Sequence, residues 1–493
     1  MTASTRRAAA VTVAVGFLMG LASALCFPAA AGAHALAGKQ DLPIPEWLFA
    51  WGASLVLIVS FVALSVAWRE PRLEKGDWRP LRGRIWGALV NRFTEAGAGA
   101  LAVFLLGVTV WSGLYGTEAP DRNFSITFVF VTVWLGFVVV SLFLGDVFRA
   151  FNPWRAIARA AAAIFAKLAG QASPPALAYP ERLGRWPAAL GLLGFLWLEL
   201  IYGASGLQTV GLTPRTVAIA ALIYSAYTFV GMALYGIEKW CDRGETFAVY
   251  FGMFGRLSPL EVRDGVLGRR RWLSGATGWA TVPGSVAVIL ITIAGTTFDG
   301  AQEGLLNGAI ASVFDTLFDQ GQGLDPVLAL RLTGSLFMAL TLGVVVAIYW
   351  AGIKGMGSGG SQHSGIRGLG RSFAHSFIPI GFAYLFAHYF SLILFQEQAQ
   401  FTYLLSDPLG NGSDYFGTAG SGIDYGLIGA ETVWYLQVAS LVIGHVVALA
   451  MGHDRALREY RDLRRATQSQ YWMLALMVSF TVLGLMLLSS ANG

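Results

Sequence analysis

The chain has 493 residues and a formal net charge of +5, with 55% hydrophobic and only 13% charged residues. This composition, with a mean hydropathy of +0.58, excludes a soluble multidomain protein and indicates a polytopic membrane protein. The basic residues are spread over alternate loops, so the positive charge does not indicate a nucleic-acid partner. The expected partner is the lipid bilayer.

The N-terminus has the features of an export signal. Arg6 and Arg7 precede an apolar run, and small residues then lead to His34. This order is typical of a secretory signal and predicts cleavage after Ala33, which makes residues 1–33 a signal peptide. An uncleaved anchor is the alternative.

Segments of about 20 apolar residues, enough to cross a hydrocarbon core of roughly 30 Å, recur along the rest of the chain. They predict an all-α polytopic membrane protein with about ten transmembrane helices in a single integral domain, residues 34–493. The expected spans lie near residues 46–68, 94–116, 125–148, 187–207, 214–237, 277–297, 327–350, 373–396, 431–453 and 471–490.

The distribution of basic residues predicts the orientation. Five alternate loops hold 28 of the 34 Lys and Arg residues, so we expect these loops in the cytoplasm and both mature ends outside the bacterial inner membrane. One of them, residues 239–275, contains an apolar stretch too short to span, which predicts an interfacial segment. The opposite loops are acidic, and residues 397–430 form a turn-rich external loop dense in Gly, Asp, Asn and Ser.

Ionisable side chains inside the expected spans are the candidates for chemistry, because a buried charge in a bilayer is costly without a partner. Glu199 and Arg331 fall at depths that allow an ion pair between their spans. Such a pair locks two helices together or anchors a substrate.

Four of the six histidines lie in or at the end of two neighbouring spans. The unequal spacings in the two spans exclude a stack of two haems, while a single haem between His375 and His453 stays open. A divalent metal held by His388 and His445 suits neutral imidazoles better. If the signal is cleaved, His34 becomes the N-terminal residue, whose amine and ring could chelate a metal at the outer face.

Five stretches together resemble a family of bacterial polytopic membrane proteins labelled fenitrothion hydrolase, a membrane-bound organophosphate hydrolase acting at the outer side of the inner membrane. The resemblance covers nearly the whole chain, and the two histidine-bearing spans are its most distinctive part. The stretches are HALAGKQDLPIPEWLFAWGASLVLIVSFVAL, NPWRAI, HSFIPIGFAYLFAHYFSLILFQ, SDPLGNGSDYFGT and VWYLQVASLVIGHVVALAMGHDRAL.

The resemblance implies hydrolysis of an apolar phosphotriester that partitions into the bilayer. In this interpretation a divalent metal on His388 and His445 activates water, and Glu199 is a third ligand or general base. Arg331 stabilises developing negative charge. The external loop covers the site with three residues that we expect near the substrate, Asp407, Asp414 and Thr418. The alternatives are a transporter or metal-handling permease and, third, a haem-bearing electron-transfer subunit.

Overall fold

The computed structural model describes residues 46–74, 77–170, 176–203, 212–279, 282–318, 323–357, 365–460 and 462–492. Within these ranges the chain is almost entirely helical, and eight helices are long and apolar enough to cross a membrane. The predicted fold class, an all-α polytopic membrane protein, is confirmed. Near the two other expected spans the described chain has the apolar stretches Trp51–Ala67 and Trp186–Tyr202, so eight of the ten expected spans coincide with helices of this kind.

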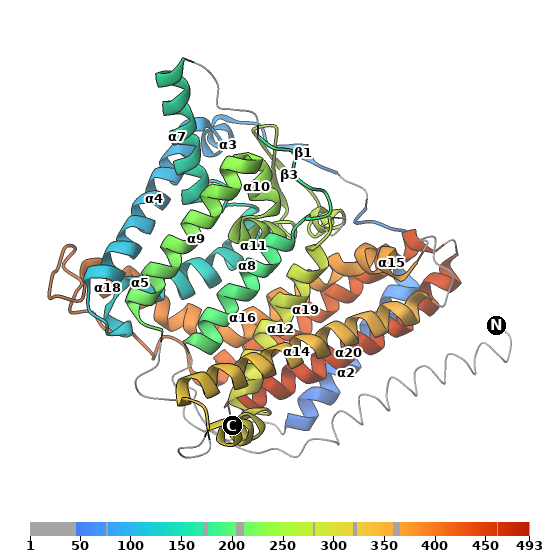
Figure 1. Ribbon diagram of the computed structural model, residues 1–493. Coiled ribbons are helices and arrows are strands. Elements are labelled where there is room, and N and C mark those ends of the chain that lie inside the picture. The colour runs from blue at the N-terminus through green and yellow to red at the C-terminus, as the bar shows by residue number, and fades with distance from the viewer. Residues whose placement is uncertain are drawn as a thin grey trace, which may run out of the picture. The chain divides into compact units, whose positions relative to one another are not determined.

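The chain forms two compact units (Figure 1). The described residues of unit 1 fall within Met1–Lys75, Ile289–His388 and Gly429–Gly493, and those of unit 2 within Gly76–Val288 and Tyr389–Ile428. Each unit has its own buried aromatic and aliphatic core, with Phe377 and Phe480 in unit 1 and Phe251 and Phe254 in unit 2.

Unit 1 is a bundle of long helices. In it α19 packs against α20 and α2, and α14 packs against α20. Small residues permit the close approach: a Cβ on Gly352 of α14 would lie 2.2 Å from the Leu476 side chain of α20. The helices are α2 (Glu46–Ala67), most of α12 (Ser285–Glu303), α13 (Asn307–Phe318), α14 (Pro326–Gly357), α15 (Ile366–Phe373), the 3₁₀ turn η7 (Ala374–Phe377), most of α16 (Ile378–Ser391), α19 (Ala430–Glu459) and α20 (Leu463–Asn492).

Unit 2 combines apolar helices with shorter segments. The helices are α3 (Arg84–Leu89), α4 (Arg92–Tyr115), α5 (Phe124–Thr127), α6 (Phe137–Leu144), α7 (Pro153–Ala169), α8 (Trp186–Trp197), α9 (Pro214–Tyr235), α10 (Ile237–Arg243), α11 (Thr246–Gly255), α17 (Glu397–Phe401) and α18 (Tyr403–Ser406). The 3₁₀ turns are η1 (Pro120–Arg122) and η4 (Ser274–Ala276). The strands β1 (Arg79–Pro80), β2 (Leu260–Arg263) and β3 (Val266–Arg269) form an antiparallel sheet in the order β1-β3-β2.

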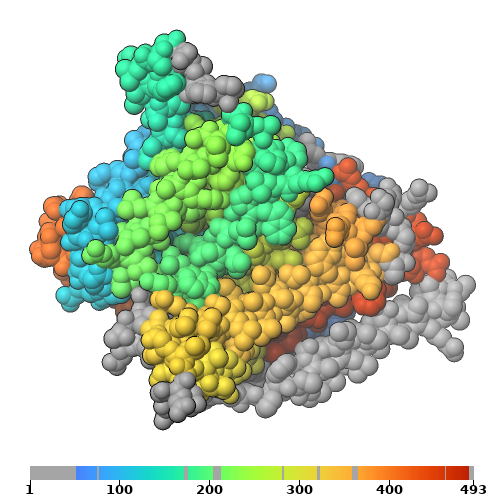
Figure 2. Space-filling model, viewed as in Figure 1, coloured from blue at the N-terminus to red at the C-terminus, as the bar shows by residue number. Residues whose placement is uncertain are grey.

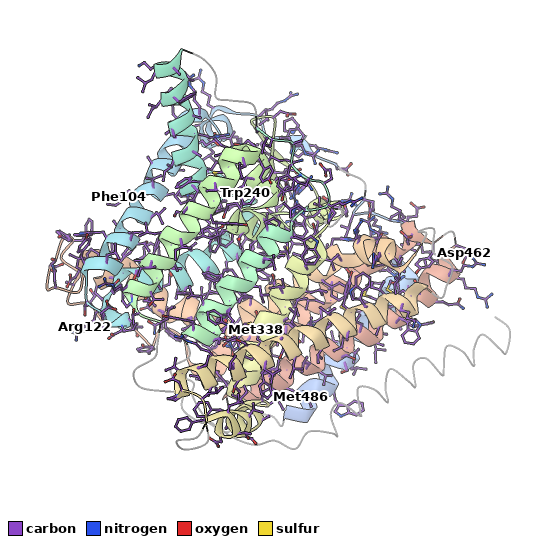
Figure 3. The ribbon with its side chains drawn as sticks, in the orientation of Figure 1. Phe104, Arg122, Trp240, Met338, Asp462 and Met486 are labelled. Carbon is purple, nitrogen blue, oxygen red and sulfur yellow. The ribbon has the colours of Figure 1, made fainter. Side chains whose placement is uncertain are left out.

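Two features of unit 2 are visible in the side-chain and space-filling views. Trp240 of α10 packs its ring on α9, where a Cβ on Gly231 would lie 2.1 Å from the indole (Figure 3). The C-terminal half of α7 projects from the rest of the unit (Figure 2). The expected interfacial segment, residues 239–275, contains most of α10, the short apolar helix α11 and the hairpin of β2 and β3.

Three helical stretches of unit 2 are π-helical. They are η2 (Phe128–Gly136), η3 (Leu198–Tyr202) and η8 (Leu392–Gln396). A π-helical turn inserts an extra residue into the helix and is frequent at functional sites. Two of the three carry or adjoin a carboxylate: Glu199 lies in η3, and Glu397 directly follows η8.

Candidate functional site

A histidine and an aspartate meet inside the helices of unit 1. His388 of α16 donates from Nε2 to Oδ2 of Asp299 on α12, at 2.8 Å. The other carboxylate oxygen, Oδ1, accepts from the Gln302 side chain at 2.9 Å. The His388 and Asp299 side chains are only 17% and 11% exposed. Each therefore finds in the other the partner that a polar group at membrane depth requires.

Glycines bring α12 and α16 together at this pair. A Cβ on Gly300 would lie 3.7 Å from the His388 ring and 3.5 Å from Leu487 of α20. About two turns along, a Cβ on Gly381 would lie 3.3 Å from the Thr292 methyl group. The two contacts follow each other in the same order on both helices, so α12 and α16 run parallel here and present His388 to Asp299.

His445 lies elsewhere in the same unit. Its ring on α19 is fully buried, and Nδ1 donates to the backbone oxygen of Leu441 at 2.7 Å. Within the described part of the chain, Nε2 has no hydrogen-bond partner. The ring of Tyr384 lies 5.9 Å away, centroid to centroid. A neutral His445 therefore keeps a buried lone pair on Nε2.

The register of α16 and α19 separates the two candidate metal ligands. A Cβ on Gly444 would lie 2.2 Å from Cβ of Ala383, so these residues are opposite each other. Gly452, further along α19, lies near Ser376, which precedes α16, so the two helices run antiparallel. His388 is five residues beyond Ala383 in one direction, and His445 is one residue beyond Gly444 in the opposite direction. The two rings thus differ in depth by about six residues, or roughly 9 Å.

A shared ion does not suit this separation, because a bound metal holds imidazole nitrogens at about 2.0–2.1 Å. Among the described residues, no group of three or more His, Cys, Asp or Glu side chains could hold a metal. His34 lies outside the described residues. The metal site on His388 and His445 therefore stays a prediction.

Glu199 and Arg331 belong to different units, so their ion pair also stays a prediction. Glu199 is half-buried in η3 of unit 2, and Arg331 is half-buried in α14 of unit 1. Burial raises the pKa of Tyr250, on α11, well above its ordinary value, and the negative charge of Glu199 adds to that rise.

The three loop residues chosen from the sequence serve the geometry of their own loop. Asp407 accepts from the backbone amides of residues 411 and 412, at 3.1 and 2.8 Å. The amide of Ala419 donates to Asp414 and holds the pKa of its carboxyl below the ordinary value. Thr418 donates to the backbone oxygen of Thr402 at 3.0 Å. These bonds order the loop, and contact with a substrate remains a prediction.

Asp299 was not among the residues selected from the sequence. Hydropathy ended the sixth expected span at residue 297 and assigned Asp299 to an acidic outer loop, whereas α12 continues to Glu303. A second pair was also missed: Thr132 in η2 donates to Oε2 of Glu397 at 3.0 Å. In the sequence, Asp299 and Glu397 each stand just after an expected span, at 277–297 and 373–396. This position could have drawn attention to them, but it does not indicate the residue that each one contacts.

Comparison with known proteins adds no name to this site. No protein-family model, curated protein or solved structure matches the chain. The function must therefore be inferred from the geometry of the chain's own residues.

Proposed function

We propose that the chain is a membrane-embedded hydrolase of apolar phosphotriesters, with His388 as general base and Asp299 as the residue that orients it. The observation that carries the proposal is the 2.8 Å contact between Nε2 of His388 and Oδ2 of Asp299 within helices of membrane-spanning length. Ionisable groups in such helices are rare and mark functional sites by default. The resemblance of the histidine-bearing spans to organophosphate hydrolases supports the same reaction class.

The pair can activate water for attack at phosphorus. Asp299 accepts the hydrogen bond that Nε2–H of His388 donates, which fixes the ring orientation, and in this proposal the imidazole takes a proton from water. The water oxygen forms a new bond to phosphorus, the bond between phosphorus and the aryl oxygen breaks, and the phenolate leaves with the electron pair. The carboxylate stabilises the imidazolium formed in this step.

The surroundings suit an apolar substrate. Much of the α16 surface around His388 is apolar and aromatic, and Gly300 on the facing helix adds no side chain. A neutral triester dissolves in the bilayer and can reach a base at membrane depth without crossing water. Arg331, in the same unit, is the residue that we expect to stabilise the developing negative charge.

The test is the release of nitrophenol from a dialkyl nitrophenyl phosphate and its thiophosphate by the purified full-length protein in nanodiscs. The variant His388→Gln keeps a donor for Asp299 but cannot take a proton. We expect its kcat to fall about 10²- to 10⁴-fold with little change in KM, because this is the usual contribution of a general base.

His375→Asn is the matched control, because His375 is a histidine of the same helical stretch that is even more buried and whose Nδ1 donates to the nearby backbone oxygen of Ser372, at 3.0 Å. This variant should keep wild-type turnover. Full activity in His388→Gln, or no release by the wild type above protein-free nanodiscs, would overturn the proposal.

A second candidate, a proton-coupled transport protein, is favoured by the pair of Thr132 and Glu397 in unit 2. Carboxylates at membrane depth carry protons in pumps and transporters. Glu397→Gln discriminates the two: it should abolish proton-coupled uptake into proteoliposomes but leave nitrophenol release unchanged. Loss of hydrolysis in this variant would instead connect Glu397 to the hydrolase.

A further inference from the structure

Residues 68–74, which we call the strap, follow α2 and are fastened to the end of α19. Asp454 accepts three hydrogen bonds from the strap: from Nε1 of Trp68 at 2.9 Å, from the backbone amide of Leu73 at 3.1 Å and from that of Arg72. The side chain of Asp454 is buried, at 1% exposure. Its acceptor capacity is used mainly to hold the strap.

Paired charges reinforce this attachment. Glu74, at the end of the strap, contacts Arg455 at 2.9 Å and also pairs with Arg458. The Glu74 side chain is only 9% exposed. The strap lies near the start of α20, the end marked by Asp462 in Figure 3, and thus at the opposite end of that helix from Met486.

His453, the residue before Asp454, joins the strap to α20. Its Nδ1 is 2.7 Å from Oε1 of Gln470 on α20, and its Nε2 is 2.8 Å from the backbone oxygen of Trp68. The ring is 0% exposed. Trp68 directly follows α2, so its carbonyl is at the end of a helix, where carbonyls lack intrahelical donors.

The two partners of His453 are both acceptors. A backbone carbonyl cannot donate, and the orientation of Gln470 is fixed because its Nε2 donates to the backbone oxygen of Ala466 at 2.8 Å. The side-chain oxygen of Gln470 therefore faces His453. Both ring nitrogens must carry a hydrogen to make these two bonds, and only the imidazolium form has both.

We propose that His453 is a proton-binding site, and that the bound proton fastens the strap to α19 and α20. When the proton leaves for water, a neutral ring retains one N–H. The oxygen of either Trp68 or Gln470 then faces the lone pair of an unprotonated ring nitrogen in a buried site, and this contact is unfavourable. The strap must loosen at Trp68, or the ring must detach from α20. Neither consequence depends on the hydrolase proposal.

The charges around His453 allow an imidazolium there. The negative end of the α2 dipole faces the ring through the Trp68 carbonyl. Asp454 is the adjacent negative group, α20 contributes the neutral Gln470, and the titratable residue of η7, which packs against α19, is His375. The charged groups of the strap are Arg69, Glu70, Arg72 and Glu74, and the others in the same stretch of α19 are Arg455, Arg458 and Glu459. The two ring nitrogens thus face two carbonyl-type oxygens, and the carboxylate of the adjacent residue is a nearby negative charge.

The direct test is nitrogen NMR of the full-length protein in nanodiscs with ¹⁵N-labelled histidine. The His453 signals are assigned by their loss in His453→Gln. At about pH 6 both ring nitrogens should show protonated shifts, and at about pH 9 one should become unprotonated. A neutral ring at the lower pH overturns the proposal, even if other variants fail to fold.

The second measurement is hydrogen exchange of the strap amides at residues 72 and 73, corrected for the intrinsic pH dependence of exchange. We expect protection in the wild type to fall about tenfold between about pH 6 and about pH 9, as His453 loses its proton. In His453→Gln protection should be weaker and independent of pH. His375→Asn is the control and should retain the wild-type pH dependence. Equal protection at both pH values in the wild type contradicts the proposed role of the proton.

Discussion

Two buried carboxylates, Glu245 of unit 2 and Asp299 of unit 1, have different kinds of partner. In unit 2, Glu245 is fully buried and caps α11: it accepts from the amides of Phe247 and Ala248, from Asn152 and from Tyr224. In unit 1, Asp299 contacts a titratable partner, His388. Burial is as complete in the structural case as in the proposed functional one. Burial alone therefore does not distinguish the two roles, and we base the proposed function of Asp299 on its imidazole partner, which can take up and release a proton.

The largest effect is expected from mutation of Asp299, for which the comparison with Glu245 predicts a loss of catalysis. Asp299→Asn removes the charge that stabilises the imidazolium and can reverse the hydrogen bond to His388. We expect nitrophenol release to fall about 10³-fold, or about 4 kcal/mol in the barrier. Gln302→Ala, which removes only the second contact of Asp299, should retain most of the activity. Equal losses in both variants would indicate that the position is structural.

For Glu245 we predict the opposite result, a loss of stability without a loss of turnover in the folded protein. Glu245→Ala removes a helix cap and leaves Asn152 and Tyr224 without their buried partner. We expect a decrease of about 3 kcal/mol in the free energy of unfolding, measured by denaturant in detergent. Glu118→Ala, at an exposed position, is the control. A folded Glu245→Ala protein without turnover would break the distinction between the units.

A smaller effect is expected where α16 and α19 approach most closely. Gly444→Ala places a Cβ 2.2 Å from that of Ala383 and should destabilise unit 1 by about 2 kcal/mol through overpacking. Gly343→Ala on α14 meets nothing within 4 Å and should be neutral or slightly stabilising. Thermal unfolding of the two variants checks this. Equal stability would show that the helices adjust without cost.

The smallest effect is expected at Glu238 of unit 2, as a dependence of stability on pH. Burial alone would raise the pKa of Glu238, but the hydrogen bond and charge of Arg155 outweigh it and lower the pKa below its ordinary value. The interaction therefore stabilises the fold at neutral pH and is lost as the pH falls through that lowered pKa. Because half of the Glu238 side chain is exposed, screening keeps the effect under about 1 kcal/mol.

Melting curves of the wild type and Glu238→Gln at about pH 7 and about pH 3 measure this difference. The two proteins should differ at neutral pH and converge in acid. A difference that grows in acid would have the wrong sign for a carboxyl with a lowered pKa.

The sequence placed His388 inside an expected span but did not identify its partner, and its role as a metal ligand stays a prediction. Hydropathy ended the span before Asp299, because a local average cannot register that a polar residue is paired across helices. From the sequence, His453 was considered as one of the two ligands of a single haem. Its acceptor at Trp68 lies 385 residues away in the chain, and no local pattern predicts such a contact. Glu245 was not distinguished from other loop residues for the same reason.

The sequence by itself determined the membrane class, the helical character and the approximate spans, because the cost of exposing polar backbone to lipid acts on every local window of about 20 residues. Only the tertiary structure decided which buried polar groups meet. Those pairings depend on helix register and on close approach at glycines such as Gly300 and Gly444. A shift of one residue in register would turn His388 from Asp299, with almost no change in the hydropathy of either helix.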